Sequence, residues 1–302
     1  MRKLVIGSTG FIGRELVTLL SEKYPGQVRA MIRSRGKLGS LAYLWGVEFV
    51  EGDVLDRESL DSAMRDHVDT VYYFAAVTGN QKNKNNLYWR VNVEGTRNAV
   101  AAAEKAGVSR FVLCSGLGTI VGEPGSYMET RWEMEEAVRR SKMAWTILQP
   151  SILFGEGSEF FEAQARIMKL LPVAALLGGG NTRFQPIHVT DVARASIEAA
   201  ESEAKIGKTI ELGGSEYYTY RELVNLMLAT IKIKRLKLPL PMWAARLNAT
   251  LFNLLPKPPL TKATLELLAY DNISADREVI KHQFGFDPDL LQPYLAKYGI
   301  KV

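Results

Sequence analysis

Residues 3–14 read Lys3-Leu4-Val5-Ile6-Gly7-Ser8-Thr9-Gly10-Phe11-Ile12-Gly13-Arg14, and this stretch decides the fold. The apolar run 4–6 predicts a short buried strand, and the apolar residues between 15 and 20 recur with helical spacing. Three glycines, three residues apart, join the two elements. A glycine turn between a strand and a helix offers backbone amides and a helix N-terminus to a phosphate group. The stretch therefore predicts a nucleotide-binding turn at the start of an α/β fold.

Each glycine of this turn has a predicted role. Gly7 permits a sharp turn, Gly10 lets the backbone approach a pyrophosphate, and Gly13 lets the helix pack closely on the strand. The spacing is G-x-x-G-x-x-G, whereas the commonest dinucleotide-binding turns have G-x-G-x-x-G. The alternative is a tight turn without a ligand, which the flanking strand and helix make the weaker interpretation. The predicted cofactor contacts here are Gly7, Thr9, Gly10, Phe11, Ile12 and Gly13.

Strands and helices alternate through the first half of the chain. Apolar runs predict further strands at 27–33, 47–53, 68–76, 110–116 and 145–149, and a long helix is expected from Tyr88 to Ala106. This alternation predicts an α/β, Rossmann-type doubly wound parallel sheet with its ligand site at the carboxyl ends of the strands. We expect a dinucleotide-binding domain at 1–150, to which 184–200 returns. Residues 151–302 are expected to form a smaller, mainly helical α/β lobe for a substrate or partner.

The end of the second predicted strand bears on the choice of cofactor. NAD-binding folds place a carboxylate about 20 residues after the glycines, where it accepts from the ribose 2′-hydroxyl. Here that place holds Arg33 and Ser34, followed by Arg35 and Lys37. Guanidinium groups bind phosphate in a bidentate manner. The alternative is a solvated basic loop, but the position favours NADP(H) over NAD(H).

Other strand ends supply the remaining predicted cofactor contacts. Asp53 could accept from the adenine amino group, or it could form an Asx turn or helix cap, and these two interpretations are compatible. The fourth strand ends in Ala75 and Ala76, and such small residues leave room for the ribose and phosphates of a cofactor to pass over the strand end. The contacts expected beyond the glycine turn are Arg33, Ser34, Asp53, Val54, Ala75, Ala76, Asn92, Ser115, Arg131 and Pro150.

Composition excludes several classes of protein. The chain has 302 residues, 47% hydrophobic and 24% charged, which is typical of a globular protein. The net charge of +5 is dispersed, so no nucleic-acid partner is expected. A single cysteine excludes an internal disulfide and fits a reducing compartment. With a strand at residue 3 and no apolar run long enough to span a bilayer, we expect a cytoplasmic protein without a signal peptide.

Histidines are scarce, and we predict no metal site. None of the three has a partner at metal-ligand spacing in the sequence. His188 is expected to be structural, and Thr190 is expected to cap a helix that ends at Ala200. Cys114 is expected to be a small core residue.

Several stretches of the chain form a recognisable set: the glycine turn, Gly52-Asp53, 92–96, 110–115, 149–151, 184–192 and the tail 258–272. Together they resemble the atypical branch of the extended short-chain dehydrogenases/reductases. The chain is similar to the nucleotide-binding accessory subunit of respiratory complex I and to NmrA-like proteins. This resemblance implies a Rossmann fold, a nicotinamide dinucleotide and an oxidoreductase-like function with an unidentified substrate.

The same resemblance implies where catalysis would occur. Reductases of this superfamily use a Tyr-x-x-x-Lys pair and a serine, and the lysine holds the nicotinamide ribose and favours the tyrosinate. The matching residues here are Tyr127 and Arg131, while the serine position falls near Gly116, one residue after Ser115. Tyr127, Arg131 and Ser115 are thus the catalytic candidates. Alternatively, Tyr127 and Arg131 are ordinary residues on a helix surface. For the protein as a whole, the alternative to an oxidoreductase is a catalytically silent nucleotide-binding subunit.

The C-terminal lobe contains a basic stretch followed by an apolar one. Lys232, Lys234, Arg235 and Lys237 precede the apolar segment 241–255. Trp243, Leu247, Leu251 and Leu254 have the spacing of one helix face. This stripe either closes the lobe over a pocket or forms an exposed patch that contacts an anionic membrane as a peripheral partner. The sequence predicts no oligomeric state.

Overall fold

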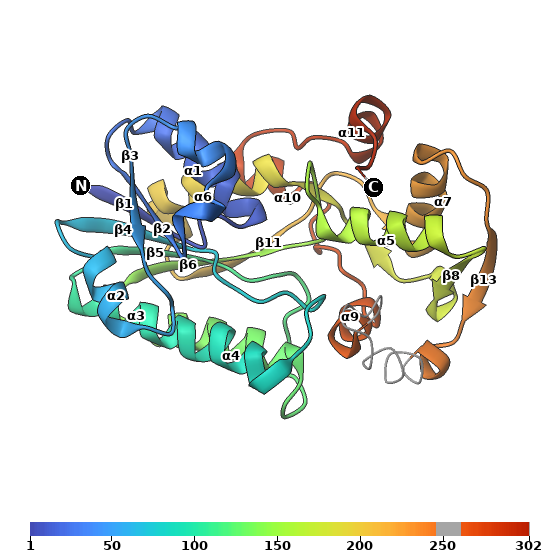
Figure 1. The fold of residues 1–302 in the computed structure, drawn as a ribbon, viewed down its shortest axis with the longest axis horizontal. Helices are drawn as coiled ribbons and strands as arrows, with labels where there is room; N and C mark the ends of the chain where they lie inside the picture. Colours follow the sequence, from blue (N-terminus) through green and yellow to red (C-terminus); the bar gives the residue numbers. More distant parts are fainter. Residues whose placement is uncertain (246–260, 302) are drawn as a thin grey trace. The chain divides into compact units, whose positions relative to one another are not determined.

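The computed structural model describes residues 1–245 and 261–301 (Figure 1). The chain folds as two compact units, each formed from discontinuous segments. Unit 1 comprises Met1–Val77, Asn83–Gln149 and Val192–Ile210, and unit 2 comprises Thr78–Lys82, Pro150–Asp191 and Glu211–Val302. The segment that returns to unit 1 was expected at 184–200, whereas in the structure it spans Val192–Ile210. No helix of the described ranges is both long and apolar enough to cross a membrane.

Unit 1 is built on a seven-stranded sheet with the order β11-β6-β5-β4-β1-β2-β3. Neighbouring strands from β3 to β6 all pair in parallel. The strand order reverses between β1 and β4, which is where dinucleotides bind in doubly wound sheets. The predicted fold class is confirmed. The strands are β1 Arg2–Ile6, β2 Val28–Ile32, β3 Val47–Glu51, β4 Val68–Tyr73, β5 Arg110–Cys114, β6 Ala144–Pro150 and β11 Lys208–Leu212.

Helices cover both faces of this sheet. Figure 1 shows α1 and α6 on one side and α2, α3 and α4 on the other. Apolar residues such as Leu4, Ile6 and Phe111 are fully buried between sheet and helices. The helices are α1 Phe11–Lys23, α2 Arg57–Ala63, α3 Gly95–Lys105, α4 Tyr127–Arg139 and α6 Val189–Glu201, with short helices η1 Arg35–Lys37, η2 Gly39–Tyr43, η3 Lys84–Asn86, η4 Trp89–Glu94 and η6 Glu203–Lys205.

Two local predictions differ from the structure. The long helix expected from Tyr88 to Ala106 begins with the π-helical η4 and becomes α-helical only at Gly95. Such π-helical turns are rare, and they occur frequently at functional sites. The prediction that Thr190 precedes its helix as a cap is wrong, because α6 already begins at Val189.

Unit 2 combines small paired strands with helices around its own core. Phe161, Leu176, Phe184, Leu223 and Met227 form much of this core. The paired strands are β7 Leu153–Phe154 with β10 Ile187–His188, β9 Arg183–Phe184 with β12 Tyr218–Thr219, and β8 Val173–Leu177 with β13 Leu236–Leu240. The helices are α5 Glu159–Leu170, η5 Gly178–Gly180, α7 Tyr220–Thr230, α9 Lys262–Leu268, α10 Val279–Phe284 and α11 Leu291–Tyr298.

Buried polar side chains link distant segments of unit 2. Ser151 Oγ lies 2.7 Å from Asn272 Oδ1. The fully buried Gln185 accepts from the amide of Ser274 at 2.7 Å and donates to the carbonyl of Arg277 at 3.0 Å. A buried amide without such partners would be destabilising. These bonds give structural reasons for the polar residues at 151, 185 and 272.

Only the start of the predicted apolar stripe can be located. Trp243 is 72% exposed. Leu247, Leu251, Phe252, Leu254 and Leu255 lie outside the described residues.

Candidate dinucleotide-binding site

Two glycines of the turn after β1 are required by the fold itself. Gly7 has φ +87°, and a Cβ there would lie 2.6 Å from the backbone nitrogen of Ala75. A Cβ on Gly13 would lie 2.2 Å from the carbonyl oxygen of Gly7. The turn, the chain after β4 and the start of α1 are therefore in close backbone contact at the switch point of the sheet.

Gly10 is different, because the fold alone does not require it. It is exposed, and within 4 Å of an added Cβ the described part of the chain places only the Gly7 oxygen, at 3.1 Å. Gly10 is also the N-cap of α1, where no side chain caps the helix and no acidic residue occupies the first turn. The N-terminal amides, from Phe11 and Ile12 onward, are thus available to an anion. This open, amide-rich turn fits a pyrophosphate.

The basic loop after β2 is held in place from the glycine turn. Ser8 Oγ donates to the carbonyl of Met31 at 2.6 Å. Arg14 donates from Nε to the carbonyl of Thr9 at 3.0 Å, and from its terminal nitrogens to the carbonyls of Leu38 and Lys37, each at 2.9 Å. Arg14 therefore ties the glycine turn to the loop. These roles of Ser8 and Arg14 were not predicted from the sequence, although both residues lie inside the glycine motif.

At the predicted 2′-phosphate position, Arg33 and Ser34 are exposed. Arg35 Nε lies 3.8 Å from Glu51 Oε1, and both side chains are mostly exposed. Arg33 follows β2 directly, at the edge of the sheet where the glycine turn lies. The structure thus brings the basic residues and the turn to the same end of neighbouring parallel strands.

Asp53 forms the Asx turn that was one of its two predicted roles. Its Oδ1 accepts from the amide of Leu55 at 2.9 Å, and its own amide donates to Ser59 Oγ at 3.0 Å. The adjacent Val54 is 7% exposed and packs tightly on Gly95. A Cβ added to Gly95 would lie 2.7 Å from Val54 Cγ2. Val54 thereby packs where α3 begins, and Asp53 is held in a defined conformation at the end of β3.

Asn92 positions the loop that follows β4. It is fully buried within η4, where its Oδ1 accepts from the amide of Val77 at 2.7 Å and its Nδ2 donates to the carbonyl of Val77 at 3.2 Å. These two bonds fix the chain immediately after Ala75 and Ala76. Asn92 therefore holds the small-residue segment of the site in position through the backbone of Val77. Pro150, the last residue of β6, has its place at the carboxyl end of that strand.

Tyr127 and Arg131 lie on the first turns of α4 and are both buried. They are 9% and 7% exposed, so neither is an ordinary helix-surface residue. Ser126 caps this helix by accepting from the amide of Glu129 at 3.1 Å. The Tyr127 ring meets the Tyr88 ring edge-on with centroids 5.1 Å apart, and the Arg131 guanidinium carbon lies 5.9 Å from the Tyr127 centroid.

The end of β5 supplies Cys114, Ser115 and Gly116. The amide of Ser115 donates to the carbonyl of Leu148 at 2.8 Å, and its Oγ lies 3.4 Å from Thr119 Oγ1. Burial raises the pKa of the Cys114 thiol to about 12, although the nearby Arg131 cation opposes this shift. Cys114 is thus a neutral thiol at physiological pH and a poor nucleophile.

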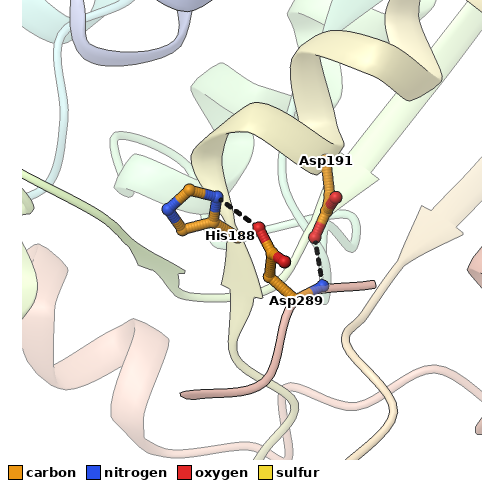
Figure 2. Close-up of side chains that lie close together, drawn as sticks. All are labelled: His188, Asp191 and Asp289. Carbon is orange, nitrogen blue, oxygen red and sulfur yellow. Dashed lines mark hydrogen bonds and ion pairs between the residues drawn. The ribbon is translucent and has the colours of Figure 1, made fainter. Parts of the chain in front are cut away.

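Unit 2 brings His188 together with Asp191 and Asp289 (Figure 2). One atom of each lies within 4.8 Å of the others, a spacing open to a metal ion. In the structure, His188 Nδ1 lies 3.2 Å from Asp289 Oδ2, and Asp191 Oδ2 accepts from the amide of Asp289 at 2.8 Å. These contacts attach the segment before α11 to the start of α6. Sequence spacing does not reveal this partner of His188, because Asp289 is about a hundred residues away in the chain.

Comparisons with known proteins find relatives that align with nearly the whole chain. A mitochondrial protein of Arabidopsis thaliana, "NADH dehydrogenase [ubiquinone] 1 alpha subcomplex subunit 9", is 29% identical over 98% of this chain and 76% of its own. "Photosystem II assembly factor Ycf39" of Guillardia theta is 26% identical over 99% and 94%. A solved nucleoside-diphosphate-sugar epimerase of Staphylococcus aureus, 16% identical, shares the fold with a TM-score of 0.77 over 98% of this chain and all of that one.

The predicted resemblance to the nucleotide-binding accessory subunit of complex I is thereby confirmed. A family described as NAD(P)H-binding matches residues 7–203, which begin at the first glycine of the turn and include β2 to β6 and α6. That match covers more than half of the chain, so the protein belongs to the NAD(P)H-binding family.

Proposed function

We propose that this protein binds NADP(H) in preference to NAD(H), as an oxidoreductase-like member of its family. The observation that carries this proposal is the basic loop after β2, which lacks a carboxylate at the strand end and is held beside the glycine turn by Arg14. Arg33 would pair with the 2′-phosphate, and the amides at the start of α1 would hold the pyrophosphate. Asn92 would maintain the loop under the cofactor.

A bound nicotinamide donates or accepts a hydride. Tyr127 would transfer the accompanying proton. It lies on α4 at the position of the tyrosine in the Tyr-x-x-x-Lys pair, and its phenolic hydroxyl can donate or accept a proton. Arg131, one helical turn later, places a positive charge near the Tyr127 ring. A cation on this side of the ring would stabilise negative charge that develops on Tyr127 as its proton is transferred. Ser115 would contribute only a hydroxyl at the end of β5.

A second candidate is a nucleotide-binding subunit or assembly factor without turnover. Gly116 lacks a side chain where the resemblance implies a serine, and Arg131 stands where it implies a lysine. Relatives are described as a complex I subunit and as an assembly factor, so a binding role in a complex suits this chain. In this role the dinucleotide would stabilise the fold, and unit 2 would contact the partner.

Unit 2 also offers a surface for a peripheral membrane partner. Leu236, Leu238 and Trp243 are 66%, 44% and 72% exposed, and Lys232 and Lys234 precede them. Exposed apolar groups beside cations suit an anionic lipid surface. The guanidinium of Arg235 is oriented by neighbouring carbonyls, since its Nε donates to the carbonyl of Met168 at 2.9 Å at the end of α5.

Calorimetric titration with NADPH and NADH, followed by a turnover assay, tests the proposal. We expect tighter binding of NADPH. If the protein turns over a substrate, Tyr127→Phe should abolish activity and leave the NADPH affinity within about twofold, since the phenol ring is retained. Arg131→Lys should retain or raise the activity. Activity that survives Tyr127→Phe would remove this residue as the proton donor, and a protein that binds neither cofactor would refute the proposal.

A further inference from the structure

The three buried arginines among the described residues differ in their partners. Arg29 and Arg110 are 2% and 7% exposed, and each forms several hydrogen bonds. Arg29 bonds Glu48 and the carbonyl of Ala63, for example, and Arg110 bonds the carbonyl of Ala144 and Thr146 Oγ1. This is the usual state of a buried cation, because an unpaired one is strongly destabilising.

Arg131 does not follow this pattern. It is 7% exposed, yet within residues 1–245 and 261–301 its guanidinium has no hydrogen-bond acceptor and no carboxylate at ion-pair distance. The buried carboxylate one turn further along α4, Glu135, is occupied by Arg139 at 2.5 Å and by Gln149 at 2.8 Å. Cys114 is held as a neutral thiol by burial. Five N–H donors at position 131 thus remain for a ligand.

The missing side chain of Gly116 makes the space for this guanidinium. A Cβ at position 116 would lie 1.9 Å from Arg131 Nη2 and 2.7 Å from Cζ, which is far inside contact distance. The backbone of Gly116 is outside the left-handed region, so an alanine there is conformationally allowed. Among the described residues, the three atoms nearest to a Cβ at position 116 all belong to the guanidinium of Arg131, which is therefore the main obstacle to a side chain there.

We propose that Gly116 and Arg131 form one coupled unit, an oxyanion-binding site at the end of β5 for a carboxylate or phosphate group. This inference rests on the proposed function for its location beside the dinucleotide. A guanidinium binds such groups with two parallel hydrogen bonds. A neutral ribose diol would leave the buried charge uncompensated, whereas an oxyanion compensates it. The anion comes either from the dinucleotide or from a second ligand with a carboxylate.

Arg131→Met separates a binding role from a structural one, with Arg110→Met as the matched control. Arg110→Met removes a bonded buried cation and should lower the urea midpoint of unfolding. Arg131→Met removes an unpaired cation and should leave that midpoint equal to or above the wild-type value. At the same time it should weaken anion binding at least tenfold. A fall in midpoint like that of Arg110→Met would overturn the proposal.

Two binding measurements identify the source of the anion. The first is the affinity for NADPH, measured by calorimetry. The second is the affinity for oxalate, obtained from the rise in the unfolding midpoint as oxalate is added, and it is measured both with and without NADPH. A tenfold loss for NADPH in Arg131→Met indicates an anion of the dinucleotide, and a tenfold loss for oxalate alone indicates a second ligand. No loss in either measurement would overturn the proposal. If wild-type protein binds neither dinucleotide, the proposed function fails, while the oxalate measurement still decides this inference.

A double-mutant cycle tests the coupling. Gly116→Ala should displace the guanidinium and lower the affinity of the affected ligand about as much as Arg131→Met does. In the Arg131→Met background, Gly116→Ala should have little further effect, because methionine is flexible and uncharged. An equal effect of Gly116→Ala in both backgrounds would overturn the coupling.

Discussion

At the end of β2, the side chain of Arg33 is exposed and offers its whole guanidinium to a ligand. We expect Arg33→Ala to weaken NADPH binding about 10- to 150-fold, since a charged hydrogen bond contributes roughly 1.5–3 kcal/mol and ~1.4 kcal/mol corresponds to tenfold. NADH affinity should hardly change. Calorimetry with both cofactors measures this, with Arg35→Ala as the control because Arg35 already lies near Glu51. Equal losses for the two cofactors would show that Arg33 does not recognise the 2′-phosphate.

The buried thiol of Cys114 leads us to predict how the stability of the protein changes with pH. Its pKa of about 12 in the folded protein lies above the unfolded value of roughly 8.5. The unfolded chain therefore loses this proton first, and stability should fall as pH rises from roughly 8.5 towards 12. Below that range Cys114 should contribute no pH dependence. Comparing urea midpoints of wild-type protein and Cys114→Ala across this range isolates the effect, and parallel curves would contradict it.

Alkylation checks the same thiol independently. We expect iodoacetamide to leave Cys114 unmodified at pH 8 in the folded protein and to modify it fully in urea, because the thiolate is the reactive form. Rapid labelling of folded protein, measured by intact mass, would contradict the buried and neutral state.

At the scale of elements, the glycine turn separates binding from stability. Gly13→Ala should destabilise the fold by roughly 1–3 kcal/mol, since its Cβ would overlap the Gly7 carbonyl. Gly10→Val should instead leave the urea midpoint nearly unchanged and abolish NADPH binding, because its side chain enters the space of the pyrophosphate. Unfolding and titration of the two variants test the contrast. A folded Gly10→Val that binds NADPH normally would exclude this turn as the site.

The elements also show why residue patterns sometimes fail. The apolar spacing from Tyr88 to Ala106 is helical, but it does not reveal the π-helical η4 at its start. The buried amide of Asn92, which lies within η4, bonds the loop after β4, and this tertiary contact is not visible in the apolar spacing. Likewise, Thr190 is a good cap residue by type, yet α6 starts one residue earlier.

For the whole molecule, the exposed apolar and basic surface of unit 2 predicts binding to anionic vesicles. Trp243→Glu should reduce co-sedimentation with phosphatidylserine-containing vesicles severalfold, and salt should weaken binding of the wild-type protein. Trp45→Glu is the matched control, because Trp45 is 92% exposed on unit 1. Wild-type protein that stays in the supernatant at low salt, or an equal effect of both variants, would reject the membrane surface.

The sequence by itself determined the fold class, the glycine turn and the nicotinamide cofactor family. These depend on local patterns: strand and helix periods, glycines where backbones touch, and basic residues at a strand end. Only the tertiary structure decided which groups share space. Arg131 lies against Gly116 although fifteen positions separate them, and His188 meets Asp289 across a hundred. Packing in three dimensions brings such residues together, and no periodicity in the chain records it.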